Sequence, residues 1–322
     1  MGFSSWFRNI FKKPSTRAIE KSAPGEVLHP LKLGLALSGG GMYGAAYIGV
    51  FRAFEEAGLK FDYVAGTSAG SLFGAAYCAG LTPKQMEDIA LNMRAKDVLS
   101  SKFIFVPNKT EKIESFVESI LDGRSFEDLK VPFCAVAVDV ISGEELHLRT
   151  GSLSKSVAGS CAFPGVFTSV DYPPFRLVDG GIMNNIPSDV VREMGADVVL
   201  AVDLNPSRGS GTDSTKYFDI LKASLRIMTK SNSYKGYVYA DHLLKLDLSD
   251  YKQFKMEGLK EMIQIGYDMA RADMPNILKT LGMRVPDESI KETAARIAEM
   301  QKRAKQIAKE NKKREKLEKT GE

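Results

Sequence analysis

The first 80 residues repeat one pattern twice: an apolar run, a glycine-rich turn, and a segment in which apolar residues recur at helical spacing. In chain order these are the run 31–37, the turn 38–41, the helical segment 42–56, the run 61–65, the turn 66–70 and the helical segment 71–79. Two short strands, each followed by a helix, predict a βαβα unit with a right-handed crossover. This beginning constrains the chain to a parallel sheet covered by helices.

The sequence beyond residue 80 continues the alternation. Helical segments at 83–94, 110–121 and 188–194 are interleaved with strand-like runs at 131–140, 145–149, 198–203 and 243–248. The run 131–140 has the density of β-branched residues typical of a central parallel strand. We therefore expect an α/β fold, a three-layer sandwich with a mostly parallel central sheet, in one domain at 29–282.

The two ends of the chain differ from this domain in composition. Residues 1–28 form a basic arm in which Phe3, Trp6, Phe7, Ile10 and Phe11 recur at helical spacing. This pattern predicts peripheral membrane contact through residues 3–13, and an arm that packs on its own domain is the alternative. Residues 283–322 are rich in Ala, Glu, Lys and Arg with a thin apolar stripe, which predicts a charged C-terminal helix and tail.

The overall balance of the chain excludes some classes of function. Lys and Arg number 44 against 40 Asp and Glu, and a net charge of +4 does not indicate nucleic-acid binding. No run approaches the roughly 18 apolar residues of a spanning helix. The cysteines Cys78, Cys134 and Cys161 lack metal-ligand spacing, which predicts reduced, buried thiols and a cytoplasmic protein, with peripheral contact at the inner face of the membrane. The oligomeric state is not indicated.

The strongest chemical signal is the turn Gly66-Thr67-Ser68-Ala69-Gly70. A G-x-S-x-G sequence between an apolar strand and a helix of small residues is the pattern of a nucleophile elbow, a sharp turn that projects a serine. Gly66 and Gly70 fit because the turn leaves no room for side chains on either side of the nucleophile. Ser68 is therefore the candidate nucleophile.

The loop Gly39-Gly40-Gly41-Met42-Tyr43-Gly44 is the candidate oxyanion hole. Glycines let backbone N–H groups converge, and the helix that follows adds its positive end. The same residues also satisfy G-x-G-x-x-G, the dinucleotide-binding fingerprint, with Asp62 near the spacing of its ribose-binding acid. That acid belongs at the end of the second strand, whereas Asp62 opens it, so the oxyanion interpretation is favoured.

The base that would activate Ser68 is less clear from the residues alone. Asp179 heads Asp179-Gly180-Gly181 at the end of the short run 175–178, where its glycines allow a close approach; a simple Asp-Gly turn explains the same residues. The chain has three histidines, and His29 and His147 are poorly placed for catalysis. His242 follows Asp179 in the order of a hydrolase triad, so a Ser68–Asp179–His242 triad remains an alternative.

Taken in order, these motifs resemble those of the patatin-like phospholipases, whose signature is a glycine-rich oxyanion loop, G-x-S-x-G and D-G-G or D-G-A. The likeness covers about residues 31–205, includes the stretches 159–164 and 179–187, and is nearest to bacterial members related to neuropathy target esterase. The resemblance implies a Ser68–Asp179 dyad, an oxyanion held near Gly40 and Gly41, an acyl-enzyme, and no metal or cofactor. It implies phospholipids or other acyl esters as substrates.

Two other functions are compatible with the same sequence. A catalytically silent adaptor would use the N-terminal arm and the C-terminal helix to bring partners to a membrane. An acyltransferase would form the same acyl-enzyme and pass the acyl group to an alcohol or thiol instead of water. The intact motifs favour the hydrolase.

Overall fold

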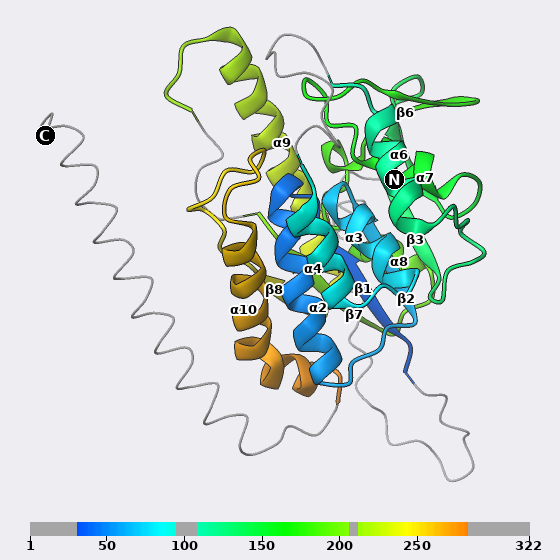
Figure 1. Ribbon diagram of the computed structural model, residues 1–322, viewed down its shortest axis with the longest axis vertical. Helices are drawn as coiled ribbons and strands as arrows, with labels where there is room; N and C mark the ends of the chain where they lie inside the picture. The colour runs from blue at the N-terminus through cyan, green and yellow to red at the C-terminus, as the bar shows by residue number, and fades with distance from the viewer. Residues whose placement is uncertain (1–30, 95–107, 206–211, 283–322) are drawn as a thin grey trace, which may run out of the picture.

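The computed structural model describes residues 31–94, 108–205 and 212–282 (Figure 1). Within these ranges eight strands form one sheet, in the order β5-β6-β3-β2-β1-β7-β8, with β4 paired to β3. Their bounds are β1 Leu33–Leu37, β2 Tyr63–Thr67, β3 Phe133–Asp139, β4 Glu144–Leu148, β5 Val170–Tyr172, β6 Phe175–Asp179, β7 Val198–Asp203 and β8 His242–Lys245. The predicted arm (1–28) and tail (283–322), including residues 3–13, lie outside the described residues.

The directions of the strands confirm a mostly parallel sheet. Strands β3, β2, β1, β7 and β8 run parallel to one another. The exceptions are β4 and β6, which pair antiparallel with β3, and β5, which pairs antiparallel with β6. The run predicted as a central parallel strand, β3, lies inside the sheet and is parallel to β2, but it is antiparallel to its other two partners, β4 and β6.

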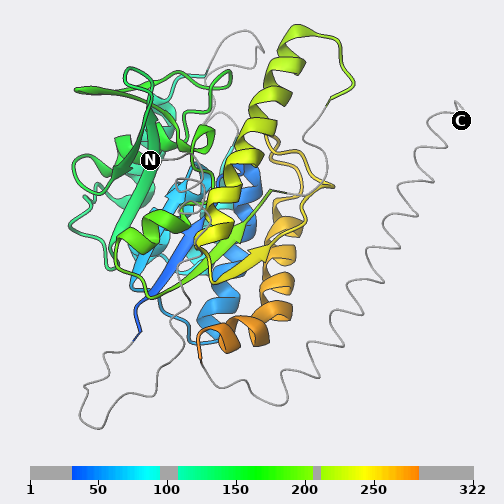
Figure 2. The ribbon, with the colours of Figure 1, turned by 180° about the vertical axis from the view of Figure 1, so that it is seen from behind.

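Helices cover both faces of the sheet (Figures 1 and 2). On one side lie η1 Gly41–Ala45, α2 Ala46–Glu56, α3 Ala69–Cys78, α4 Pro83–Asn92, α6 Glu111–Leu121, α7 Leu153–Ser160 and α10 Leu259–Thr280. On the other lie α8 Ser188–Glu193 and α9 Tyr217–Tyr239, with the short turn η2 Gly180–Ile182 at the end of β6. The sequence patterns did not predict α7, α9 or α10. None of the helices in the described ranges is long and apolar enough to cross a bilayer.

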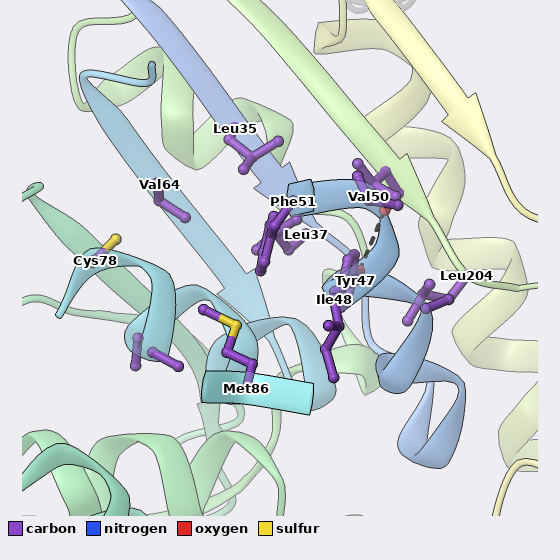
Figure 3. Close-up of a cluster of buried hydrophobic side chains, with 14 of the residues drawn as sticks. Leu35, Leu37, Tyr47, Ile48, Val50, Phe51, Val64, Cys78, Met86 and Leu204 are labelled. Atoms are coloured by element: carbon purple, nitrogen blue, oxygen red, sulfur yellow. Dashed lines mark hydrogen bonds between the residues drawn. The ribbon is translucent and has the colours of Figure 1, made fainter. Parts of the chain in front are cut away.

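Alternation along the strands divides the interior into two cores. In β1, Leu35 and Leu37 enter one core and Ala36 the other. The larger core is filled by residues of α2 such as Tyr47 and Phe51, which pack near the leucines of β1 (Figure 3). Because each strand buries side chains on both faces, the central strands are apolar throughout, as parallel sheets require.

The pairing of β3 explains how distant segments meet at the carboxyl edge of the sheet. Strand β4 occupies one side of β3 from Ala135 to Asp139. Strands β2 and β6 must therefore share the other side, where Thr67 pairs with Val136 and Asp179 pairs with Ala137. Consequently β2 and β6 approach end to end, and the residue after Thr67 lies at the level of Asp179.

Candidate active site

Ser68 occupies the junction between β2 and α3 with a strained backbone. Its φ of 52° and ψ of −122° are rare for a residue with a side chain, and such conformations cost about 1–3 kcal/mol. A Cβ on Gly66 would lie 2.2 Å from the carbonyl oxygen of Gly70, and a Cβ on Gly70 would lie 2.1 Å from that of Leu37. The two glycines thus let the turn close, as the motif predicts.

A buried hydroxyl holds the elbow in place. The N–H of Ser68 donates to Oγ of Ser160 at 2.9 Å, and the hydroxyl of Ser160 donates to the carbonyl oxygen of Val136 at 2.6 Å. Ser160 is fully buried at the end of α7. It thereby ties the strained turn to the neighbouring strand. In the sequence, Ser160 is distinguished only by its small neighbours, and no role was predicted for it.

Asp179 ends β6 and is 2% exposed. Its Oδ1 accepts the N–H of Gly181 at 2.8 Å, whereas its buried Oδ2 has no hydrogen-bond partner among the described residues. Burial raises the pKa of Asp179 to about 6, although the Ser68 hydroxyl and the Gly181 N–H act in the opposite direction. A buried carboxylate with a vacant acceptor atom beside a serine hydroxyl is suited to receive a proton.

The loop before η1 lies against Ser68, but its glycines have different roles. The N–H of Gly39 donates to the carbonyl oxygen of Asn185 at 3.1 Å, so Gly39 is not available as an oxyanion donor and this part of the prediction is corrected. A Cβ on Gly39 would lie 3.2 Å from Cβ of Ser68, so the glycine permits close approach. Among the described residues, the N–H groups of Gly40 and Gly41 have no hydrogen-bond partner.

The remaining predicted glycines serve packing. A Cβ on Gly44 would lie 2.7 Å from the ring of Phe73, so this position brings η1 against α3. A Cβ on Gly180 would lie 2.3 Å from the carbonyl oxygen of Val136, and Gly181 supplies the N–H bonded to Asp179. These contacts place the loop 179–181, called the acid loop below, against β3 and directly beside the elbow.

An apolar cavity of about 390 Å³ opens beside Ser68. It is lined from α3, α4 and α6, by residues such as Phe73, Met86 and Phe116, and no charged residue is among the described residues that line it. Met93 and Asn108 also line the cavity, and residues 95–107 between them lie outside the described ranges.

His242 and His147 lie away from this site. His242 opens β8 and bonds through Nε2 to Asp273 at 2.6 Å. The strand register places His242 level with Val64, which lies three strands away on β2. Because Val64 is four residues before Ser68, the distance between His242 and Ser68 is roughly 19 Å at ordinary strand spacings. The alternative Ser68–Asp179–His242 triad is therefore wrong for this arrangement.

His147 is likewise bonded to groups other than those of the site. His147 on β4 bonds to Glu145 at 2.9 Å and to Glu193 at 3.1 Å, and these partners raise its pKa. It belongs to a network of ion pairs with Glu145 and Glu193, and none of these pairs involves Ser68. His29 lies outside the described residues.

The acid of the dinucleotide alternative is also at the wrong end of its strand. Asp62 precedes β2 and accepts hydrogen bonds from the Lys32 ammonium at 2.7 Å and from the Leu33 N–H at 2.9 Å. Asp62 thus has a structural role at the amino ends of the parallel strands, opposite the candidate site. Asp203, at the end of β7, accepts the Asn205 N–H at 2.9 Å and the Tyr237 hydroxyl at 2.6 Å.

Comparison with known proteins places this geometry in a family. Residues 35–192 match the family model described as Patatin-like phospholipase. The chain carries a patatin-like phospholipase domain. The matched region contains the glycine-rich loop 39–44, Ser68 and Asp179, so the predicted resemblance is confirmed.

Curated relatives are similar to the patatin-like domain over part of their length. Patatin-like phospholipase domain-containing protein 7 of Rattus norvegicus is 32% identical over 226 residues, which is 67% of this chain and 16% of that protein. The corresponding protein 6 of Homo sapiens is 31% identical over 224 residues, with the same two shares. An uncharacterized NTE family protein of Mycobacterium tuberculosis is 33% identical over 186 residues, 56% of this chain and 32% of that one. The chain thus spans about a third or less of these relatives.

A solved structure shows the same fold. VipD from Legionella pneumophila superposes on the chain with a TM-score of 0.55 at 13% sequence identity, covering 88% of this chain and 77% of that one. The predicted α/β sandwich of patatin-like type is therefore confirmed.

Proposed function

We propose that the chain is a lipid acyl hydrolase in which Ser68 is the nucleophile and Asp179 the general base. One observation supports this most directly: β2 and β6 meet end to end, so that a strained serine and a buried carboxylate oxygen without a partner lie together beside an apolar cavity. Neither feature stabilises the fold, and both are expected where a protein is organised for chemistry.

The reaction follows from the roles of these groups. Oγ of Ser68 attacks the ester carbonyl carbon while Oδ2 of Asp179 takes the hydroxyl proton. The N–H groups of Gly40 and Gly41 stabilise the negative charge that develops on the carbonyl oxygen. The ester bond breaks, the leaving alcohol takes the proton from Asp179, and an acyl-Ser68 remains. Asp179 then accepts a proton from water, whose oxygen attacks the acyl group, and Ser68 regains its proton as the carboxylic acid leaves.

The cavity supplies the specificity for an acyl chain. Its volume lies in the range typical of small-molecule pockets, about 300–1,000 Å³. Its aliphatic and aromatic lining favours a hydrocarbon, because burial of apolar surface contributes about 25 cal/mol per Å². With Ser68 at one side of this cavity, an acyl chain inside it places the ester carbonyl at the nucleophile and the alcohol portion toward the exterior.

Two measurements on the same variants test the proposal. A fluorophosphonate probe is expected to label the parent protein and not Ser68→Ala, while the control Ser119→Ala, altered on the exposed part of α6, is labelled like the parent. Release of fatty acid from phospholipids and p-nitrophenyl esters is expected to fall at least about 10³-fold in Ser68→Ala. A Ser68→Ala protein as active as the parent would refute the proposal.

A further inference from the structure

Helix α9 presents two buried polar groups that nothing in the described structure satisfies. The Nε of Arg226 and the hydroxyl of Thr229 are both buried, and neither has a hydrogen-bond partner among the described residues. Buried polar groups are nearly always hydrogen-bonded, and each exception requires an explanation. The two residues are three positions apart on one helix, so their side chains lie on the same face.

This face of α9 overlooks the site from the side opposite the cavity. A Cβ on Gly181 would lie 3.4 Å from the methyl group of Thr229 and 3.0 Å from Oδ1 of Asp179, so Thr229 is beside the acid loop. Arg226 is close to Tyr43 of η1: burial raises the pKa of Tyr43, and the charge of Arg226 partly offsets that effect. One turn of α9 therefore extends from the acid loop toward the oxyanion loop.

The charge of α9 fits an anionic ligand at this place. Tyr217–Tyr239 contains one acidic residue, Asp219, against four basic ones, Lys222, Arg226, Lys230 and Lys235, of which Lys235 is paired with Glu145 and Asp189. A guanidinium and a hydroxyl are donors suited to phosphate oxygens, and Arg binds phosphate in a fixed fork geometry. The two sides of Ser68 thus differ in chemistry: an uncharged, apolar cavity lies on one side and the Arg226 guanidinium of α9 on the other.

We propose that Arg226 and Thr229 form a subsite for the phosphate of a phospholipid substrate whose acyl chain occupies the cavity. The inference rests on the proposed function, because it assigns the head-group side of the same ester substrate. It makes Arg226 a determinant of specificity: it favours acyl esters that carry a phosphate over neutral esters with the same chain.

The test measures binding in a Ser68→Ala background, so that it does not depend on turnover. The ligands are octanoyl lysophosphatidylcholine, used below its micelle concentration, and mono-octanoylglycerol, which lacks the phosphate. Arg226→Gln is expected to weaken lysophospholipid binding about ten- to a hundredfold more than monoacylglycerol binding, since hydrogen bonds to charged groups are strong. Arg226→Lys should restore part of the preference, and Thr229→Val should reduce it about three- to tenfold.

The control removes the same charge elsewhere. Lys216→Gln, ten residues earlier and about 15 Å along the helix direction, is expected to leave the preference for the phosphate unchanged. Equal weakening of both ligands by Arg226→Gln would show a merely structural residue and overturn the subsite. So would an absence of preference for the lysophospholipid in the Ser68→Ala protein that retains Arg226.

Inorganic phosphate distinguishes a lipid head group from free phosphate. It is expected to displace the lysophospholipid only at millimolar concentration, because it lacks the acyl chain. Tight phosphate binding that Arg226→Gln abolishes, without any preference for the lysophospholipid, would assign the site to free phosphate and overturn the lipid role. Failure of the probe to label Ser68 would refute the proposed hydrolase instead, and the binding result would remain independent of it.

Discussion

The two edges of the sheet, at the amino and carboxyl ends of its parallel strands, differ in how completely their polar groups are hydrogen-bonded. At the amino edge, where the parallel strands begin, the carboxylates of Asp62 and Asp241 have partners. Asp62 accepts the Leu33 N–H and the Lys32 ammonium, and Asp241 pairs with Arg192. This edge is built like the surface of an ordinary stable domain, in which buried or half-buried charges are matched.

At the carboxyl edge the matching is incomplete. Ser68 has a positive φ, Oδ2 of Asp179 lacks a partner among the described residues, and Arg226 and Thr229 each carry a buried group in the same condition. The amino edge has fewer such features: the Nε of Arg149 is buried without a partner among the described residues, and Asp122 has a positive φ. In open α/β sheets ligands bind outside the carboxyl ends of the strands, so the concentration of these features around Ser68 supports the proposed site at this edge.

The largest expected effect is on kcat, which should depend on the carboxyl edge and not on the amino edge. Asp179→Asn removes the proton acceptor and should lower kcat on p-nitrophenyl esters by about 10³- to 10⁴-fold. His242→Ala, at the amino edge, should retain kcat within about threefold, because this histidine bonds to Asp273 far from Ser68. Steady-state kinetics of the two purified variants provide the comparison. A large loss of kcat in His242→Ala would show that the dyad is incomplete.

The second effect concerns pH. Burial raises the pKa of Asp179 to about 6, above the unfolded value of 3.8. The contribution of this residue to stability is therefore fully present below pH 3.8 and is lost as the pH rises through 6. The free energy of unfolding of Asp179→Asn relative to the parent should thus increase between pH 4 and 7, by about 1–3 kcal/mol. Denaturant unfolding at several pH values measures it. The parent's kcat should decline below pH 6 as Asp179 becomes protonated.

A flat difference in unfolding free energy across that range would contradict the raised pKa. Asp62→Asn is the opposite-edge control. Burial raises the pKa of Asp62, but hydrogen bonds from Lys32 and Leu33 outweigh it and the net pKa is lowered. Its contribution to stability is present above the unfolded pKa and is lost as the pH falls. The free energy of unfolding of the parent should therefore increase relative to that of Asp62→Asn as the pH rises.

Much of the carboxyl edge was predictable from sequence because its constraints are local. The spacing of Gly66 and Gly70 around Ser68 reflects contacts between atoms within one turn and the adjacent strand. The order of the motifs then indicated Asp179. The fold class followed in the same way from the alternation of strands and helices.

The missed features depend on contacts between distant segments. Helix α10 contains Gly266 and Pro275, which argue against a helix in isolation. A Cβ on Gly266 would lie 2.0 Å from the carbonyl oxygen of Ala46, and a Cβ on Gly49 would lie 1.9 Å from that of Ile263. The glycines thus permit α2 and α10 to pack closely. No local pattern contains this information, and the same holds for Ser160 and Arg226.

The third effect tests one such missed residue. Ser160→Ala removes the acceptor of the Ser68 N–H and should reduce kcat about ten- to a hundredfold, since the elbow loses the group that fixes its position. Ser156→Ala, one turn earlier on α7, removes a buried hydroxyl that bonds to the carbonyl oxygen of Ser152 instead, and should retain kcat. Equal kcat in the two variants would show that the hydrogen bond to Ser68 does not position the nucleophile.

The smallest expected effect belongs to the amino edge. Asp62→Ala removes hydrogen bonds to Lys32 and to the Leu33 N–H at a partly exposed site, where such interactions contribute about 1 kcal/mol. The free energy of unfolding should therefore fall by about that amount while kcat remains within about twofold of the parent. Urea unfolding and ester kinetics on one preparation measure both quantities. A variant that unfolds like the parent but loses activity would reverse the assignment of the two edges, because function would then depend on the edge where the polar groups are matched.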